Sequence, residues 1–189
     1  MERNQRPQPQ ADMPHPVRLL LLEDNAADAE LAQRLLGKAG LELATVVVET
    51  RAAFVEQLAA FGPHIVLSDF ALPGFSGAAA LEIAQEGYPD VPVIIWSGVL
   101  GDEAAVELIK HGATDYILKD RPARLASAIR RALAEAGQRV RLARLEADLH
   151  EARRLASLGQ LAAAGQALSQ AREQLADARR EAMAADTTA

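Results

Sequence analysis

The chain has 189 residues, half of them hydrophobic, with a formal net charge of −6 at pH 7 and no cysteine. This length provides one well-buried core plus an extension, and the lack of cysteine excludes disulfides, zinc-thiolate sites and thiol catalysis. A negative charge without a Lys/Arg-rich tract predicts no nucleic acid and no membrane among the partners, because both need clustered positive charge.

Residues 1–16 are predicted to form a disordered leader. The segment contains four prolines and several glutamines and has almost no apolar side chains, so it cannot offset its own ordering entropy. It lacks the apolar stretch of a secretion signal, and no later run approaches the roughly 20 apolar residues of a membrane span. These features predict a cytoplasmic protein.

Five short apolar runs follow from Val17 onward, and each is about as long as a β-strand. They are residues 17–22, 43–48, 64–68, 92–96 and 115–119. Nearly continuous apolar runs of this length are typical of strands that are covered on both faces. We therefore predict five internal strands.

Longer amphipathic stretches separate these runs and predict helices. Capping side chains stand where the helices should begin, at Asn25, Thr50, Ser76 and Asp102. Glycines stand where they should end, at Gly40, Gly62, Gly87 and Gly112. A fifth helix is expected from about Pro122. Because right-handed crossovers join parallel strands, this order predicts an α/β fold, (βα)5, with a parallel sheet between two helical layers.

Polar side chains stand at the carboxyl ends of the predicted strands. Glu23 and Asp24 follow the first strand, Asp69 follows the third, Ser97 follows the fourth and Lys119 ends the fifth. The carboxyl ends of parallel strands share one edge of the sheet, where such folds bind their ligands. We therefore expect three carboxylates, one hydroxyl and one ammonium group to converge at this edge.

This set of groups predicts phosphoryl chemistry. Three ionised carboxylates in contact require a cation between them, and oxygen ligands without His or Cys favour Mg²⁺ or Mn²⁺. Lys119 would place a second positive charge beside a phosphoryl group. We infer that Asp69 is the nucleophile that attacks phosphorus and becomes an aspartyl phosphate, while Ser97 hydrogen-bonds a phosphoryl oxygen after reaction.

Four motifs, LLLEDN, LSDFALPGFSG, VIIWSG and DYILK, occur in an order and at a spacing that resembles the receiver domain of two-component response regulators. The resemblance covers residues 17–136. It implies a flavodoxin-like receiver with a five-stranded parallel sheet. It also implies that a sensor histidine kinase or a phosphotransfer protein donates the phosphoryl group from a histidine.

The resemblance assigns roles to individual residues. It implies that Asp24, Asp69 and the Ala71 backbone carbonyl hold Mg²⁺, with Glu23 acting through water. Asp69 matches the phosphoacceptor. Tyr116 matches the switch aromatic that turns inward when the hydroxyl at the end of the fourth strand moves.

Two departures from the family pattern concern the site. Asp120 follows Lys119, where relatives usually have proline, so a cis Lys-Pro bond is not expected. Ala71 and Val99 are small and apolar at positions near the acceptor where polar side chains in relatives affect attacking water. Their identity suggests slow hydrolysis of the aspartyl phosphate.

Some of these residues also have purely structural explanations. Asp24 could help to cap the following helix, where Asn25 and Asp28 resemble a capping box. Tyr116 could simply pack at the strand edge. Trp96 should point to the face opposite the switch hydroxyl and lie in the core.

Residues 137–189 have the Ala, Leu, Arg, Glu and Gln content of a long helix. An interrupted heptad seam runs along it, formed by Leu142, Leu145, Leu149, Ala152, Leu155, Leu158, Leu161, Leu168 and Leu175. A single helix cannot bury such a stripe. We predict a homodimer, as a coiled coil or four-helix bundle, through this C-terminal extension. The alternative is a stripe that folds back on the receiver through a bend at Gly137, Gly159 or Gly165.

The stretch RRLASLGQLAAAG resembles the opening of the dimerisation helix of sensor histidine kinases, but Ala167 stands where the phosphorylated histidine is expected. His150 is not expected to replace it. We therefore predict a response regulator that is not an enzyme. The alternatives are a non-catalytic dimeric scaffold with a vestigial acidic pocket, a receiver-plus-linker fragment of a larger signalling kinase, and a phosphohydrolase. The last usually needs a second Asp at the position of Ala71.

Overall fold

The computed structural model describes residues 14–98 and 102–186. The chain divides into two compact units, Met1–Val140 and Arg141–Ala189. Most of the predicted leader, residues 1–13, lies outside the described residues, and so does Val99. The side chains of Asp102, Leu158 and Leu161, which the sequence singled out, also lie outside the described part of the chain.

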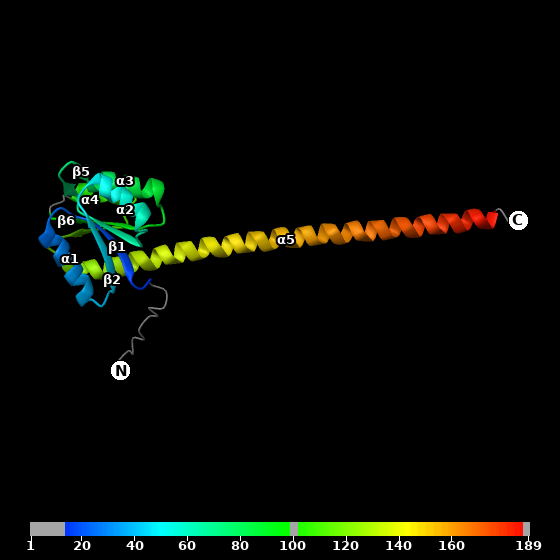
Figure 1. Cartoon of the computed structure of the whole chain (residues 1–189), viewed down its shortest axis with the longest axis horizontal. Helices are drawn as coiled ribbons and strands as arrows, with labels where there is room; N and C mark the ends of the chain where they lie inside the picture. Colours follow the sequence, from blue (N-terminus) through cyan, green and yellow to red (C-terminus); the bar gives the residue numbers. More distant parts are fainter. Residues whose placement is uncertain (1–13, 99–101, 187–189) are drawn as a thin grey trace, which may run out of the picture. The chain divides into compact units, whose positions relative to one another are not determined.

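A five-stranded parallel sheet forms the centre of the first unit (Figure 1). Its strands are β1 (Val17–Leu22), β2 (Leu43–Val48), β3 (Ile65–Ser68), β6 (Val93–Ser97) and β7 (Asp115–Leu118). Their order is β2-β1-β3-β6-β7, so the strand order reverses between β1 and β3. This is the flavodoxin-like order of a doubly wound α/β fold, and the predicted fold class is confirmed.

Helices cover both faces of the sheet. On one face lie α1 (Ala26–Lys38) and the first turns of α5 (Leu125–Asp186), which follows a short 3-10 turn, η1 (Pro122–Arg124). On the other face lie α2 (Arg51–Ala60), α3 (Gly77–Gly87) and α4 (Asp102–Lys110). Successive strand residues point to opposite faces, so each face has its own core. Trp96 is fully buried with α1 and α5, as predicted.

The sequence missed a small hairpin in the loop after β3. It pairs β4 (Ala71–Leu72) with β5 (Phe75–Ser76) in antiparallel fashion. Gly74 turns the chain with a φ of 75°, a left-handed conformation that glycine adopts without strain. Leu72 and Phe75 are buried, and the Phe75 ring centroid lies 5.7 Å from that of Phe54 on α2. Strands of two residues are too short to produce a periodic pattern.

Three predicted N-caps are confirmed. The side chains of Asn25, Thr50 and Ser76 each accept a backbone N–H from the first turn of α1, α2 and α3, respectively. Such caps satisfy donors that the helix itself leaves without partners, and each contributes about 1 kcal/mol. The caps therefore place the helix starts where local sequence predicted them.

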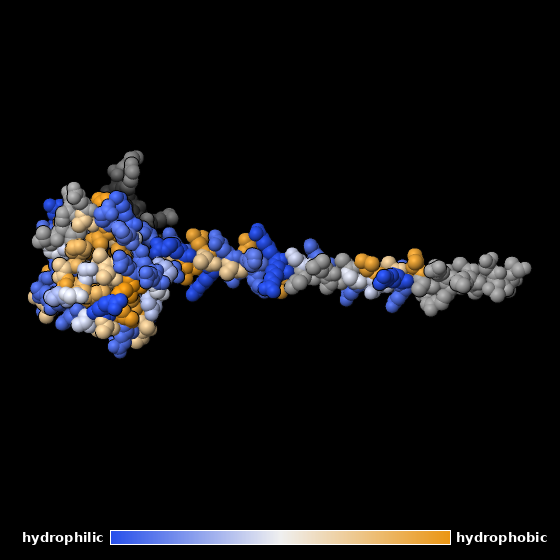
Figure 2. All heavy atoms as spheres, turned by 90° about the horizontal axis from the view of Figure 1, so that it is seen from above, coloured by the Kyte–Doolittle hydropathy of each residue, from blue (hydrophilic) through white to orange (hydrophobic). Residues whose placement is uncertain are grey.

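The second unit consists of the continuation of α5. The helix is unbroken at Gly137, in the first unit, and at Gly159 and Gly165, in the second. Apolar side chains are exposed along it, between polar ones (Figure 2). Among the leucines of this unit whose side chains are described, the exposed fraction ranges from 50% for Leu149 to 72% for Leu175. No helix in the described ranges combines the length and apolar composition of a membrane span.

His64, just before β3, links stability to pH. Its Nδ1 accepts the Arg18 backbone N–H at 3.1 Å, and the Arg18 Nε donates to the Gly62 carbonyl at 2.7 Å. Burial, and secondarily the Arg18 charge, lower the pKa of His64. The unfolded chain therefore binds this proton at a higher pH than the folded one. The stability that His64 contributes is present above the unfolded pKa of about 6.5 and is lost as the pH falls through the lower folded value.

We expect His64→Asn to make the free energy of unfolding less dependent on pH between 5 and 7. An asparagine Oδ1 can accept the same Arg18 N–H but does not titrate. Urea unfolding at several pH values, followed by Trp96 emission, measures the slope. His150→Asn, on the exposed surface of α5, is the control and should leave the slope unchanged. Equal slopes for wild type and His64→Asn would contradict this expectation.

Candidate functional site

The strand register brings the predicted site residues to one edge of the sheet. Leu22 of β1 pairs with Ser68 of β3, and the Asp69 N–H donates to the Leu22 carbonyl at 2.8 Å. At β6, the Lys119 N–H donates to the Ser97 carbonyl at 2.8 Å. The residues that end or follow these strands therefore leave the sheet at its carboxyl edge.

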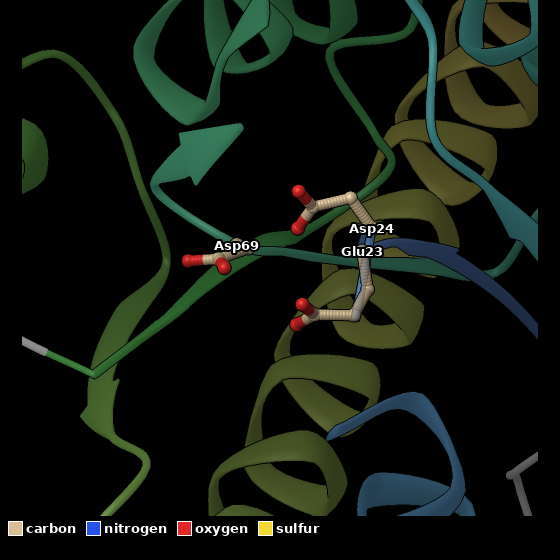
Figure 3. Close-up of side chains that lie close together, drawn as sticks. All are labelled: Glu23, Asp24 and Asp69. Atoms are coloured by element: carbon tan, nitrogen blue, oxygen red, sulfur yellow. The ribbon is translucent and has the colours of Figure 1, made fainter. Parts of the chain in front are cut away.

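Three carboxylates form a cluster at this edge. One oxygen from each of Glu23, Asp24 and Asp69 lies within 4.8 Å of the others. Figure 3 shows the three carboxylates on the same side of the strand ends. Glu23 and Asp69 are buried, whereas Asp24 is exposed and leaves the cluster accessible from solvent.

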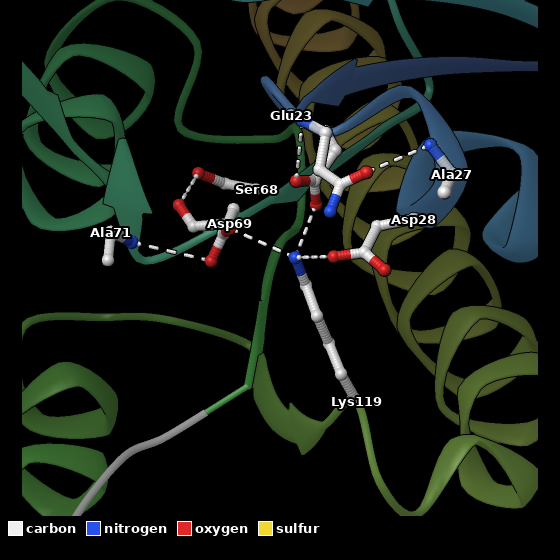
Figure 4. Close-up of polar contacts among 8 residues, drawn as sticks. Glu23, Ala27, Asp28, Ser68, Asp69, Ala71 and Lys119 are labelled. Atoms are coloured by element: carbon white, nitrogen blue, oxygen red, sulfur yellow. Dashed lines mark hydrogen bonds and ion pairs between the residues drawn. The ribbon is translucent and has the colours of Figure 1, made fainter. Parts of the chain in front are cut away.

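Lys119 lies against this cluster with each of its three N–H groups on a carboxylate (Figure 4). Its Nζ is 2.7 Å from Glu23 Oε2, 2.8 Å from Asp28 Oδ2 and 2.9 Å from Asp69 Oδ2. The ammonium also stands 5.3 Å from the centroid of the Trp96 ring. A cation close to an aromatic face is attracted by the ring quadrupole.

The buried charges perturb one another. Burial raises the pKa of Glu23 above its usual value, although the Lys119 hydrogen bond and charge oppose this effect. Burial alone would lower the pKa of Lys119, but its hydrogen bonds to Asp28, Glu23 and Asp69 outweigh burial and hold that pKa above its usual range. Lys119 therefore carries a positive charge at neutral pH.

The contact between Asp28 and Lys119 was not predicted from the sequence. Asn25 and Asp28 do not form the capping box considered above, because the Asn25 N–H donates to Glu23 Oε1 at 3.2 Å. The Asp28 carboxylate accepts from Lys119 instead. An Asp in the first turn of a helix has a sufficient local explanation in the helix dipole, so only the tertiary structure reveals this role.

The backbone around Asp69 is closely held. The Ala71 N–H donates to Asp69 Oδ1 at 3.3 Å, and the Ser68 hydroxyl donates to the Asp69 carbonyl at 2.8 Å. The Gly77 N–H donates to the Phe70 carbonyl at 2.9 Å. The role of the Ala71 carbonyl as a metal ligand stays a prediction.

Ser97 lies on β6, the strand next to β3, and Tyr116 lies on β7, the edge strand beyond β6. Ser97 is the buried last residue of β6, beside the carboxyl edge. Tyr116 is half-buried in β7, opposite Ile95, and packs against the core shared with α2, α3 and α4. Tyr116 also lines a surface hollow of about 370 Å³ with Val106 and others. The switch roles of both residues stay predictions.

The donor chemistry of the cluster fits Mg²⁺. All three groups that converge are carboxylates, and hard divalent cations prefer such oxygen ligands. With Asp28, four carboxylates surround a single lysine, and this leaves an excess of negative charge that a divalent cation would neutralise. Glu23, Asp24 and Asp69 are therefore the residues able to hold the ion.

The chain matches known protein sequences in its first unit. Residues 19–130 match the model of the family described as the response regulator receiver domain. The chain is 34% identical to the DNA-binding transcriptional regulator NtrC of Escherichia coli K12 over 99 residues, 52% of this chain and 21% of that protein. It is 32% identical to the response regulator protein FleR of Pseudomonas aeruginosa over 108 residues, 57% of this chain and 22% of that protein. The matches thus span about a fifth of these relatives.

Solved structures resemble the same part of the chain. A CheY-like response regulator receiver domain protein from Methanospirillum hungatei is 25% identical, with a TM-score of 0.58. That match covers 65% of this chain and 98% of the other. The BeF3-activated N-terminal receiver domain of RstA from Klebsiella pneumoniae is 27% identical, with a TM-score of 0.56. The match to this domain covers 61% of the present chain and 97% of the RstA chain.

Proposed function

Because the chain belongs to the response regulator receiver family of two-component signalling, we propose that it accepts a phosphoryl group on Asp69 from a histidine of a sensor kinase or phosphotransfer protein. The observation that supports this role most directly is the position of Asp69. Its carboxylate contacts the Lys119 ammonium and lies in the cluster with Glu23 and Asp24. The carboxylate proposed as nucleophile, a lysine ammonium and two further carboxylates that fit a metal ion therefore lie close together.

The transfer forms one bond and breaks one. A carboxylate oxygen of Asp69 forms a bond to phosphorus as the phosphorus–nitrogen bond of the donor phosphohistidine breaks, and the electron pair stays on the ring nitrogen. Lys119 turns an N–H toward the developing charge on the phosphoryl oxygens. A bound Mg²⁺ would neutralise further phosphoryl charge. The Ser97 hydroxyl then donates to a phosphoryl oxygen of the product, and Tyr116 moves inward with it.

The test is phosphorylation of the full chain with a small donor, phosphoramidate, in the presence of Mg²⁺. We expect one added phosphoryl group by intact mass, absent in Asp69→Asn and strongly reduced when EDTA removes the metal. Asp90→Asn, at an exposed acid after α3, is the control and should behave as wild type. We also expect the adduct to outlast donor removal by minutes or more.

Other outcomes would contradict the proposal. An adduct that persists in Asp69→Asn would place the phosphoryl group elsewhere. Continuous release of phosphate, with turnover, would favour the phosphohydrolase alternative. No adduct at all would favour the scaffold with a vestigial acidic pocket.

We further propose that α5 pairs with α5 of a second copy, as the output of the receiver. Leu142, Leu145 and Leu149 are at least half exposed and follow a heptad spacing. Charges flank this stripe in a complementary way. In a parallel pair, Arg141 would face Glu146 of the second copy, and Asp148 would face Arg153. Such pairs favour association of two copies in register.

Sedimentation of the full chain tests this pairing. We expect a dimer for wild type, and a monomer when Leu145 and Leu149 are both changed to Lys, because two buried charges in the seam are costly. Ala147→Lys is the matched control, because Ala147 lies on the opposite side of the same helical turns and should leave the dimer intact. A wild-type monomer, with and without beryllofluoride as phosphate mimic, would contradict the pairing.

A further inference from the structure

The Lys119 ammonium has no spare N–H for a phosphoryl group in this structure. A lysine ammonium carries three donors, and all three point at carboxylates (Figure 4). Phosphoryl transfer therefore requires Lys119 to give up one partner while staying in place. Which partners stay decides whether the ammonium remains in the site.

Two of the three carboxylates that hold Lys119 have other roles in the proposed reaction, Asp69 as phosphoacceptor and Glu23 in the cluster that fits a cation. Asp69 loses its negative charge when it becomes an acyl phosphate, so its bond to Lys119 weakens during the reaction. Glu23 belongs to the cluster that fits a divalent cation. Asp28 lies outside that cluster and on α1, so it is neither the phosphoacceptor nor one of the carboxylates that fit a cation.

The local geometry leaves the Asp28 carboxylate available for this contact. The cap of α1 is made by Asn25, whose side chain accepts the Ala27 N–H at 2.9 Å. The Asn25 N–H, which a capping box would direct to residue 28, donates to Glu23 instead. Asp28 is also the most exposed of the three partners, with 29% of its side chain accessible against 0% for Glu23 and 12% for Asp69.

We propose that Asp28 is a positioning residue that anchors the Lys119 ammonium while its third hydrogen bond passes from Asp69 to the phosphoryl group. This inference rests on the proposed phosphoacceptor function. Asp28 itself forms and breaks no covalent bond and exchanges no proton in the step. The anchor matters in this chain because residue 120 is Asp, so no proline ring fixes the backbone that follows Lys119.

The test compares Asp28→Ala and Asp28→Asn in the full chain, again with phosphoramidate and Mg²⁺. We expect Asp28→Ala to slow adduct formation at saturating donor by roughly 10-fold to 100-fold, as misplacement of a reacting group does. Asp28→Asn keeps an oxygen acceptor and should recover most of the rate. Glu30→Ala and Glu30→Gln are the matched controls, because Glu30 is an exposed acid two residues further along α1 that pairs with Arg34. Both controls should react as wild type does.

A second readout reports the position of Lys119 directly. Trp96 is the single tryptophan of the chain, and the Lys119 Nζ is 5.3 Å from its ring centroid. We expect Asp28→Ala to change Trp96 emission before any donor is added, and Asp28→Asn to change it less. Asp28→Asn removes the same charge as Asp28→Ala but keeps an oxygen acceptor, so a larger change of emission in Asp28→Ala would come from movement of Lys119.

Asp28→Glu separates geometry from charge if the alanine variant unfolds. It keeps a negative charge at the helix start but shifts the carboxylate by one methylene, so we expect a slower reaction. A wild-type rate in Asp28→Glu, with unchanged Trp96 emission, would reject the role of Asp28 as an anchor even if Asp28→Ala does not fold. It would leave the phosphoacceptor function of Asp69 standing. A wild-type chain that forms no adduct would reject the phosphoacceptor function and this inference with it.

Discussion

Lys119→Met is expected to lower the free energy of unfolding by about 3 kcal/mol at pH 7 without Mg²⁺, the size of effect seen when one partner of a buried ion pair is removed. The ammonium neutralises a group of acids within 2.9 Å, and the Glu23 side chain among them is fully buried. Without Lys119, these carboxylates repel one another in a region of low dielectric. Mg²⁺ should restore part of the lost stability, because it can occupy the same group of oxygens.

The same substitution should slow adduct formation on Asp69 by roughly 100-fold, the effect of removing one donor to developing charge. Urea unfolding followed by Trp96 emission and intact mass after phosphoramidate treatment measure the two effects. Lys110→Met is the control for losing a lysine. Its pair with Glu107 is exposed on α4, so we expect a change of less than about 1 kcal/mol and a normal adduct. Equal stability of the two variants would show that the buried cluster does not depend on Lys119.

Gly77→Ala is expected to lower the free energy of unfolding by about 2 to 3 kcal/mol, since overpacking forces atoms apart in a filled region. A Cβ at Gly77 would lie 2.5 Å from the Asp69 carbonyl oxygen and 2.9 Å from the Phe70 Cα. Both are backbone atoms that cannot rotate away. The segment that carries Asp69 must therefore move, and we expect adduct formation to fall with stability.

Gly37→Ala, inside α1, is the matched control for this substitution. A Cβ there meets no heavy atom within 4 Å, and alanine favours helix over glycine by up to about 1 kcal/mol. We therefore expect this variant to be as stable as wild type or more so, with a normal adduct. A Gly77→Ala chain that is equally stable and equally reactive would show that the start of α3 does not constrain the phosphoacceptor loop.

The fold could be predicted closely from the sequence because the βα units have local signals, an apolar run for each strand and capping residues at helix starts. All five apolar runs became strands of the central sheet, and Asn25, Thr50 and Ser76 became caps through contacts with residues two or three positions away. The hairpin of β4 and β5 was missed because its two-residue strands have no period to detect. The placement of Trp96 in the core followed from strand alternation alone.

The candidate site was predictable to the extent that it lies at strand ends. Glu23, Asp69 and Lys119 meet as expected, since parallel strands bring their carboxyl ends to one edge. Asp28 was not recognised as a member, because its contact with Lys119 joins α1 to the end of β7. The roles of Ser97, Tyr116 and the Ala71 carbonyl in phosphoryl transfer remain predictions.

The sequence by itself determined the five strands of the central sheet, the starts of α1, α2 and α3, and which residue types stand at the strand ends. These features depend on hydrophobic periodicity and on capping bonds between residues close in the chain. Only the tertiary structure decided how the ammonium of Lys119 is shared, because its partners lie 96, 91 and 50 positions away. A hydrogen bond between such distant residues depends on strand order, register and helix packing together, and it leaves no pattern in the local sequence.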